Sequence, residues 1–140
     1  MSVRRVMPKE AESLLAEGYV YVDVRSVPEF EESHPAGAYN APLMHAGPGG
    51  MTPNPEFLAA MQRAFPVDAR LLLGCRSGAR SLRAAEALAA AGYTDLVDLQ
   101  TGFDGNRDGF GRVVAAGWRD AGLPVESGPG ARGWATLSGK

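Results

Sequence analysis

Short apolar runs alternate with longer amphipathic stretches along most of the chain. Three runs are short and rich in β-branched, aromatic or aliphatic side chains, and we interpret them as buried strands: residues 19–24, 71–73 and 96–99. Between them, apolar residues recur at helical spacing over residues 8–16 and 81–91, and Gly18 and Gly92 end these two predicted helices. The alternation predicts an α/β fold in which helices flank a central parallel sheet.

Two further helices are predicted from capping signals. Ser26 and Glu29 have the spacing of a capping box, which predicts a short helix that carries Phe30. Asn54 can cap a longer helix with Pro55 at its first position. The apolar residues of this longer helix form a stripe, which we attribute to core packing rather than to a groove for a partner: Phe57, Leu58, Met61 and Phe65.

The remaining segments are rich in glycine or proline. Residues 35–53 predict mostly loop, and residues 101–112 predict a second loop rich in Gly and Asp. Residues 113–121 predict a last helix that ends at Gly122. The chain therefore shows no linker that would divide it into two domains.

Composition limits the class of protein. The length of 140 residues fits one compact domain, which we place at residues 1–125, followed by a flexible tail over residues 126–140 in which Trp134 is the candidate for a docking contact. A net charge of -2 and a pI of about 5.7 argue against a nucleic-acid partner. No apolar run approaches the ~20 residues that cross a bilayer, and no signal peptide is evident. We therefore expect a cytoplasmic protein without a membrane partner.

The chain has one cysteine, Cys75. An internal disulfide and a zinc site built on several thiolates are therefore excluded, and we expect neither a metal nor a cofactor. A lone cysteine is either a small buried hydrophobic residue or a nucleophile. The residues around Cys75 favour the nucleophile.

Cys75 follows the predicted strand 71–73 and precedes the predicted helix 81–91. Ligand sites of parallel sheets lie at the carboxyl ends of strands, and backbone N–H groups of a tight loop form an anion-binding nest. The helix dipole and two nearby arginines add positive potential, and these influences stabilise a thiolate. Cys75 is thus the candidate nucleophile, and the candidate substrate-binding residues are Arg76, Ser77, Gly78, Ala79, Arg80 and Ser81.

Four segments together resemble the rhodanese family. The loop reads Cys-x-x-Gly-x-Arg-Ser from Cys75, and residues 23–25 read Asp-Val-Arg after a strand. Residues 30–42 resemble the family signature Phe-x-x-x-His-Ile-Pro-Gly-Ala-x-Asn-Ile-Pro. Residues 117–118 and 122–125 resemble the family's closing helix and turn, so the resemblance covers about residues 7–125.

The resemblance implies a rhodanese-like fold and sulfur transfer. Thiosulfate or another small donor would leave its outer sulfur on Cys75 as a persulfide, and cyanide, a thiol or a protein acceptor would remove it. The backbone of residues 76–81 would cradle the persulfide, and Arg76 and Arg80 would attract the donor anion.

Some residues depart from the family pattern or invite other roles. Pro35-Ala36 stands where Ile-Pro is usual, Gly74 precedes the cysteine, and residues 103–112 extend the loop after Thr101-Gly102 near the expected pocket mouth. Polar residues outside the loop are assigned to the fold rather than to catalysis. Asp23 and Arg25 are expected to form structural hydrogen bonds or a pair with Glu29, His34 is expected to brace its own loop, and His45 has no motif around it.

Two alternatives remain open. Cdc25-type phosphatases and arsenate reductases of related fold place five residues between the cysteine and a phosphate-binding arginine, whereas four residues separate Cys75 from Arg80. Such reductases also tend to use a second thiol. The other alternative is a catalytically silent rhodanese-like module that serves in binding or regulation, although such modules typically lose the cysteine.

Overall fold

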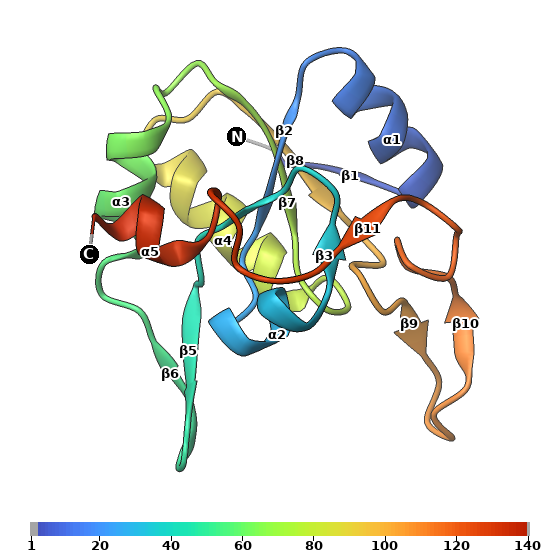
Figure 1. Cartoon of the computed structure of the whole chain (residues 1–140). Helices are drawn as coiled ribbons and strands as arrows, with labels where there is room; N and C mark the ends of the chain where they lie inside the picture. Colours follow the sequence, from blue (N-terminus) through green and yellow to red (C-terminus); the bar gives the residue numbers. More distant parts are fainter. Residues whose placement is uncertain (1–2, 140) are drawn as a thin grey trace.

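The computed structural model describes residues 3–139, which fold around a central parallel sheet (Figure 1). Its five strands lie in the order β1-β8-β7-β2-β4, and every neighbouring pair is parallel. The strands are β1 (Arg4–Val6), β2 (Val20–Asp23), β4 (Tyr39–Asn40), β7 (Arg70–Gly74) and β8 (Asp95–Leu99). The predicted α/β class with a central parallel sheet is confirmed.

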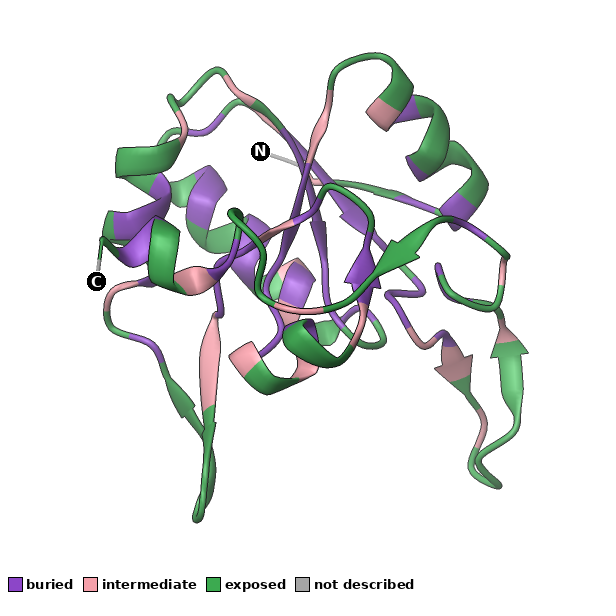
Figure 2. Cartoon of the chain, in the orientation of Figure 1, coloured by how far each residue is buried: buried purple, intermediate pink, exposed green. Residues whose placement is uncertain are grey.

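Helices cover both faces of the sheet, so the central strands are buried along most of their length, with less burial at their first residues (Figures 1 and 2). Helix α1 (Pro8–Ala16) lies on one face, whereas α3 (Phe57–Ala64), α4 (Ala79–Ala90) and α5 (Trp134–Ser138) lie on the other. Side chains of a strand point alternately to the two faces. Leu72 accordingly packs in the core with α1, and Leu71 and Leu73 pack in the core with α3 and α4.

Four of the five predicted helices agree with the structure except near some ends. Helix α1 has the predicted bounds, and the capping box at Ser26 begins α2 (Val27–Glu32). Helix α3 begins at Phe57 rather than at Pro55, because the Asn54 side chain accepts from the N–H of Glu56 and thereby stabilises a turn before the helix. Helix α4 begins at Ala79, two residues before the prediction.

The apolar stripe on α3 is only partly buried. Phe57 and Met61 are in the core, as expected, whereas Phe65 is half-buried and Leu58 is 37% exposed. Leu58 lies beside a shallow cavity at the base of the β5–β6 hairpin, which is formed by β5 (Met44–Gly47) and β6 (Gly50–Pro53). The prediction of core packing therefore holds for the inward side of the stripe.

Two hairpins replace segments that were predicted as loop or helix, and both project from the body (Figure 1). The β5–β6 hairpin lies within the predicted loop 35–53. The helix predicted over residues 113–121 is wrong. Instead, β10 (Val113–Ala115) pairs antiparallel with β9 (Asn106–Arg107), because adjacent β-branched residues favour a strand.

Residues 126–140 were predicted as a flexible tail. The described part of this segment contains α5, which contacts α3, and Leu137 is 9% exposed. At the start of this segment, β11 (Val125–Glu126) pairs with β3 (His34–Pro35). Trp134 packs against the core, which gives it the expected docking contact. The flexibility of the tail in solution stays a prediction.

Candidate active site

Cys75 lies directly after β7, at the centre of the carboxyl edge of the sheet. Its residue is 2% exposed, and its sulfur faces the interior of the loop that leads into α4. The N–H of Gly78 donates to Sγ at 3.1 Å, and the thiol lies 3.4 Å from the Ser81 hydroxyl oxygen. Of the residues predicted to cradle the sulfur, Gly78 and Ser81 therefore contact it directly in this structure.

Glycine is required at position 78. Its φ of +103° lies in the left-handed region, and a Cβ there would stand 2.3 Å from the carbonyl oxygen of Gln100. This conformation turns the chain so that the next residue begins α4. The sulfur consequently lies near the positive end of a 12-residue helix.

An ion pair lies behind this loop. Arg5 Nε donates to Asp98 Oδ2 at 2.7 Å, and Arg5 Nη2 donates to the carbonyl oxygen of Gly78 at 3.1 Å. The Asp98 side chain is 0% exposed. Burial raises the pKa of Asp98, whereas the Ser81 hydroxyl and the Arg5 guanidinium lower it less strongly. Among residues 3–139, Asp98 Oδ1 is buried and has no hydrogen-bond partner.

Both arginines of the loop are paired with carboxylates that are distant in sequence. Arg76 Nε contacts Asp104 Oδ2 at 3.0 Å, and Arg119 Nη2 contacts Asp104 Oδ1 at 2.9 Å. Arg80 binds Glu29 with two hydrogen bonds of 2.7 and 3.0 Å. The sequence predicted the two loop arginines as donor-attracting cations but gave no sign of these partners.

Glu29 holds the loop to helix α2. It accepts from Arg80 and also from the backbone and side chain of Ser26. Burial raises the pKa of Glu29, but the hydrogen bonds from Arg80 and Ser26 and the charge of Arg80 outweigh it and bring the pKa to about 2. The carboxylate therefore stays charged at neutral pH and keeps Arg80 in place.

A charged cavity of about 300 Å³ opens between α2 and the segment after β8. Arg76 connects it to the Cys75 loop, and Glu29 connects it to Arg80. The Phe103 ring lies beneath two guanidiniums, 4.5 Å from Arg25 and 5.3 Å from Arg119. The lining residues are Arg25, Glu29, Glu32, Ser33, Arg76, Phe103, Asp104 and Arg119.

Of these lining residues, the sequence predicted only Arg76 as a site residue, and it assigned Arg25 and Glu29 to the fold. Phe103 and Asp104 follow the Thr101-Gly102 turn, and the N–H of Phe103 donates to the Cys75 carbonyl oxygen at 2.8 Å. Arg119 was not recognised as a site residue, because it lies in the segment 113–121 that was wrongly predicted as a helix. The extension over residues 103–112 was expected near the pocket mouth, and its first two residues do line the cavity.

The polar residues outside the loop have structural contacts. Arg25 binds Asp23 through a buried pair with an Nη2–Oδ2 distance of 2.8 Å, which confirms the fold-supporting role and excludes Glu29 as its closest partner.

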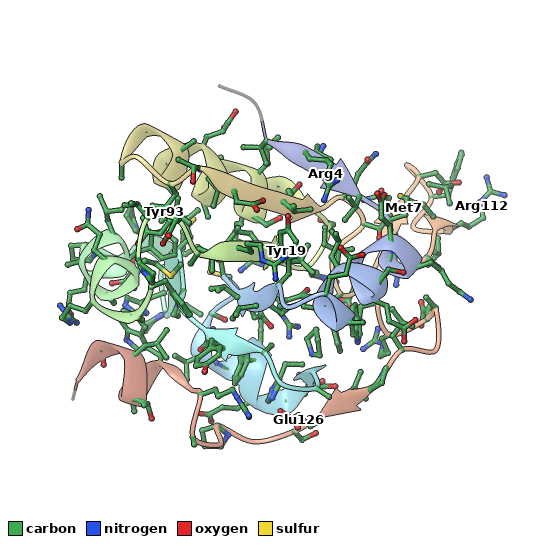
Figure 3. The ribbon with its side chains drawn as sticks, turned by 90° about the horizontal axis from the view of Figure 1, so that it is seen from above. Arg4, Met7, Tyr19, Tyr93, Arg112 and Glu126 are labelled. Atoms are coloured by element: carbon green, nitrogen blue, oxygen red, sulfur yellow. The ribbon has the colours of Figure 1, made fainter. Side chains whose placement is uncertain are left out.

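His34 Nδ1 lies 2.7 Å from the Phe30 carbonyl oxygen, and Nε2 lies 3.2 Å from Glu126 Oε1, so His34 braces its loop as predicted. Figure 3 labels Glu126 on the strand that runs beside this loop. Among the described aromatic pairs, His45 has one partner, Trp134, with the two rings inclined by 62° and their centroids 6.1 Å apart.

Comparisons with known proteins agree with this architecture. A family model described as "Rhodanese-like domain" matches residues 7–107. Thiosulfate sulfurtransferase 16, chloroplastic, of Arabidopsis thaliana is 35% identical over 117 residues, which cover 84% of this chain and 88% of that protein. Senescence-associated protein DIN1 of Raphanus sativus is 35% identical over 116 residues, covering 83% of this chain but 57% of that protein.

A solved structure shows the same fold. The crystal structure of Rv0390 from M. tuberculosis has a TM-score of 0.77 and 31% sequence identity to this chain, and the match covers 91% of this chain and 100% of that chain. Within residues 3–139, no helix is long and apolar enough to cross a membrane. With the sheet order, the Cys75 loop and these relatives in agreement, the chain belongs to the rhodanese-like domain family.

Proposed function

We propose that this chain is a thiosulfate sulfurtransferase that carries sulfane sulfur as a persulfide on Cys75. The observation that carries the proposal is the convergence of the Gly78 N–H, the Ser81 hydroxyl and the start of α4 on one sulfur atom. The relative from Arabidopsis thaliana with 35% identity supports it, because that protein is named a thiosulfate sulfurtransferase. The expected cytoplasmic location remains part of the proposal.

In the first step, the Cys75 thiolate attacks the outer sulfur of thiosulfate. The new Sγ–S bond forms as the S–S bond of thiosulfate breaks, and the bonding electron pair leaves with sulfite. The outer sulfur then carries the negative charge. The α4 dipole favours a negative charge at this place. The Gly78 N–H donates to Sγ and so stabilises the attacking Cys75 thiolate, because hydrogen bonds to a charged acceptor are about twice as strong as neutral ones.

In the second step, cyanide or a thiolate attacks the outer sulfur. The Sγ–S bond breaks, its electron pair returns to Cys75 as a thiolate, and the acceptor leaves as thiocyanate or as a persulfide. No second cysteine is present to discharge the adduct as an internal disulfide. The acceptor therefore comes from outside the chain, as a small molecule or as a protein.

The phosphatase alternative fits this site less well. Four residues separate Cys75 from Arg80, and Arg80 is already bound by both oxygens of Glu29. A phosphate-binding arginine needs its parallel donors free for the substrate oxygens. Hydrolysis of an aryl phosphate that is abolished by Cys75→Ser would favour the phosphatase class instead.

The test is a thiosulfate:cyanide sulfurtransferase assay on the wild type and on Cys75→Ser. We expect thiocyanate production by the wild type and none above background by the variant. Both proteins should show the same thermal unfolding midpoint, because serine has nearly the volume of cysteine. A folded wild type without turnover would point to a catalytically silent binding module, and an active Cys75→Ser variant would exclude the persulfide mechanism.

A further inference from the structure

The Arg5–Asp98 ion pair lies behind the Cys75 loop, and the proposed transfer steps do not use it. Arg5 comes from edge strand β1, and Asp98 comes from β8. Their side chains are 35% and 0% exposed, and 2.7 Å separates Nε from Oδ2. A carboxylate with no exposed surface is costly without its cation. Asp98 therefore fixes the place of the Arg5 guanidinium.

The same guanidinium reaches the cysteine loop. Arg5 Nη2 donates to the Gly78 carbonyl oxygen at 3.1 Å, while the Gly78 N–H donates to Cys75 Sγ at 3.1 Å. A Cβ on Gly78 would stand 2.9 Å from Arg5 Nη2, so the two groups fit closely. Gly78 is thus held from both sides, by Arg5 behind the loop and by the sulfur within it.

We propose that Arg5 and Asp98 are positioning residues for Cys75: Asp98 holds the Arg5 guanidinium, and the guanidinium holds Gly78 so that its N–H points at the sulfur. The proposal rests on the proposed function, because sulfur transfer is the reaction that this N–H assists. The planar guanidinium has several donors in a fixed arrangement, which allows one side chain to bind both acceptors. A lysine ammonium is a compact point charge and cannot bridge the two sites in this way.

Three variants separate positioning from charge and from folding. Arg5→Gln removes a positive charge and Asp98→Asn removes a negative one, so a purely electrostatic effect would shift the ionisation of the sulfur in opposite directions. Positioning predicts the same direction for both, since each variant releases Gly78. Arg5→Lys keeps the charge and the partner of Asp98 but loses the bridge to Gly78.

The first readout is the rate at which iodoacetamide alkylates Cys75 as a function of pH. We expect the midpoint of this profile to move to higher pH in both Arg5→Gln and Asp98→Asn. The second readout is persulfide formation at saturating thiosulfate. We expect it to be about tenfold slower in all three variants with little change in KM, a smaller loss than the 10²–10³-fold that follows complete removal of a charge-stabilising donor.

Asp95→Asn is the matched control. Asp95 begins the same strand, away from the cysteine, and accepts from the Tyr19 hydroxyl at 2.8 Å. Tyr19 is labelled in Figure 3. The Asp95→Asn substitution should lower the thermal unfolding midpoint slightly and leave the alkylation profile of Cys75 unchanged.

Two results would overturn the positioning role. The first is that the midpoint of the alkylation profile shifts in opposite directions in Arg5→Gln and Asp98→Asn. The second is that folded Arg5→Lys forms the persulfide at the wild-type rate. The second result is decisive even when Asp98→Asn does not fold. A failure of the proposed function is recognised separately. In that case the wild type takes no sulfur from thiosulfate, while the alkylation comparison still reports on Gly78.

Discussion

The Cys75 loop is held from two sides that differ in burial. Behind it, Asp98 is fully buried against Arg5; in front, Arg76 and Arg119 are 62% and 47% exposed and share Asp104. Water and salt screen exposed charges strongly and a buried pair much less. We call the Arg5–Asp98 pair, with the Gly78 that it holds, the rear side of the loop, and Arg76 and Arg119 the front side. The difference in burial indicates that the rear side determines the geometry at the sulfur, whereas the front side determines the affinity for an anionic donor.

The largest effect is expected from Gly78→Ala, which disturbs the rear side. The new Cβ would stand 2.3 Å from the Gln100 carbonyl oxygen, and alanine disfavours a φ of +103°. The loop must move, so we expect persulfide formation to slow by about two orders of magnitude, comparable to the loss of a charge-stabilising donor. Rapid mixing with thiosulfate followed by intact-mass analysis measures this rate.

Gly92→Ala is the control for backbone strain alone. Gly92 has a φ of +101°, but a Cβ there would meet no atom within 4 Å. This variant should lose about 1 kcal/mol of stability and keep the wild-type rate. If Gly78→Ala formed the persulfide as fast as the wild type, the rear side would have no geometric role at the sulfur.

A smaller effect is expected from substitutions in front. Replacement of both Arg76 and Arg119 by Ala should raise the KM for thiosulfate about tenfold at low salt and leave kcat nearly unchanged, because exposed cations steer an anion without contacting the reacting sulfur. The difference from wild type should shrink as ionic strength rises. Steady-state kinetics at several salt concentrations measure it.

Arg112→Ala serves as the matched control for these two substitutions. Arg112 is an exposed arginine in the turn of the β9–β10 hairpin and pairs with Asp108, and Figure 3 shows it at the outer edge of the molecule. Its loss should leave KM unchanged. A large fall in kcat with unchanged KM in the double variant would contradict the division between front and rear.

The last effect is on stability rather than on rate, and it concerns Glu29, a half-buried residue of α2 that binds Arg80 of the loop. Its folded pKa of about 2 is below the ordinary value of 4.5, so its stabilising contribution is fully present above pH 4.5 and is lost as pH falls toward 2. The lowering of the pKa from 4.5 to about 2 corresponds to about 3 kcal/mol of stability at neutral pH. Glu29→Gln should lose about this much at pH 7 and little at pH 2, as measured by urea unfolding.

Glu31→Gln tests whether this loss is specific to the Arg80 contact. Glu31 is exposed on the same helix and does not line the charged cavity. Its replacement should leave the free energy of unfolding within about 0.5 kcal/mol of wild type. Equal acid sensitivity of wild type and Glu29→Gln would show that the Arg80–Glu29 pair does not hold the loop.

Local pattern was sufficient for much of the fold. Periodicity and capping signals predicted α1, α2 and the three central strands, because those elements are specified by their own residues. The cysteine loop was also predictable, since its glycine and its place between a strand and a helix are local features. The prediction of a helix over residues 113–121 was wrong, because Val113 and Ala115 pair with a strand that is itself only two residues long.

The partners of the loop were not predictable from local pattern. Glu29 lies 51 positions from Arg80, Asp104 lies 28 positions from Arg76, and Asp98 lies 93 positions from Arg5. One signal was present in the sequence. Asp98 is the charged residue of the otherwise apolar predicted strand 96–99, and a buried charge requires a partner. The sequence does not identify that partner, because the tertiary fold brings Arg5 to it.

The most direct test of the persulfide on Cys75 is the intact mass of the protein after incubation with thiosulfate. The wild type should gain the mass of one sulfur atom, lose it on addition of cyanide, and regain it with fresh thiosulfate. Cys75→Ser should keep its original mass throughout. A wild-type mass that stays unshifted under several sulfur donors, or an equal gain in Cys75→Ser, would contradict the account.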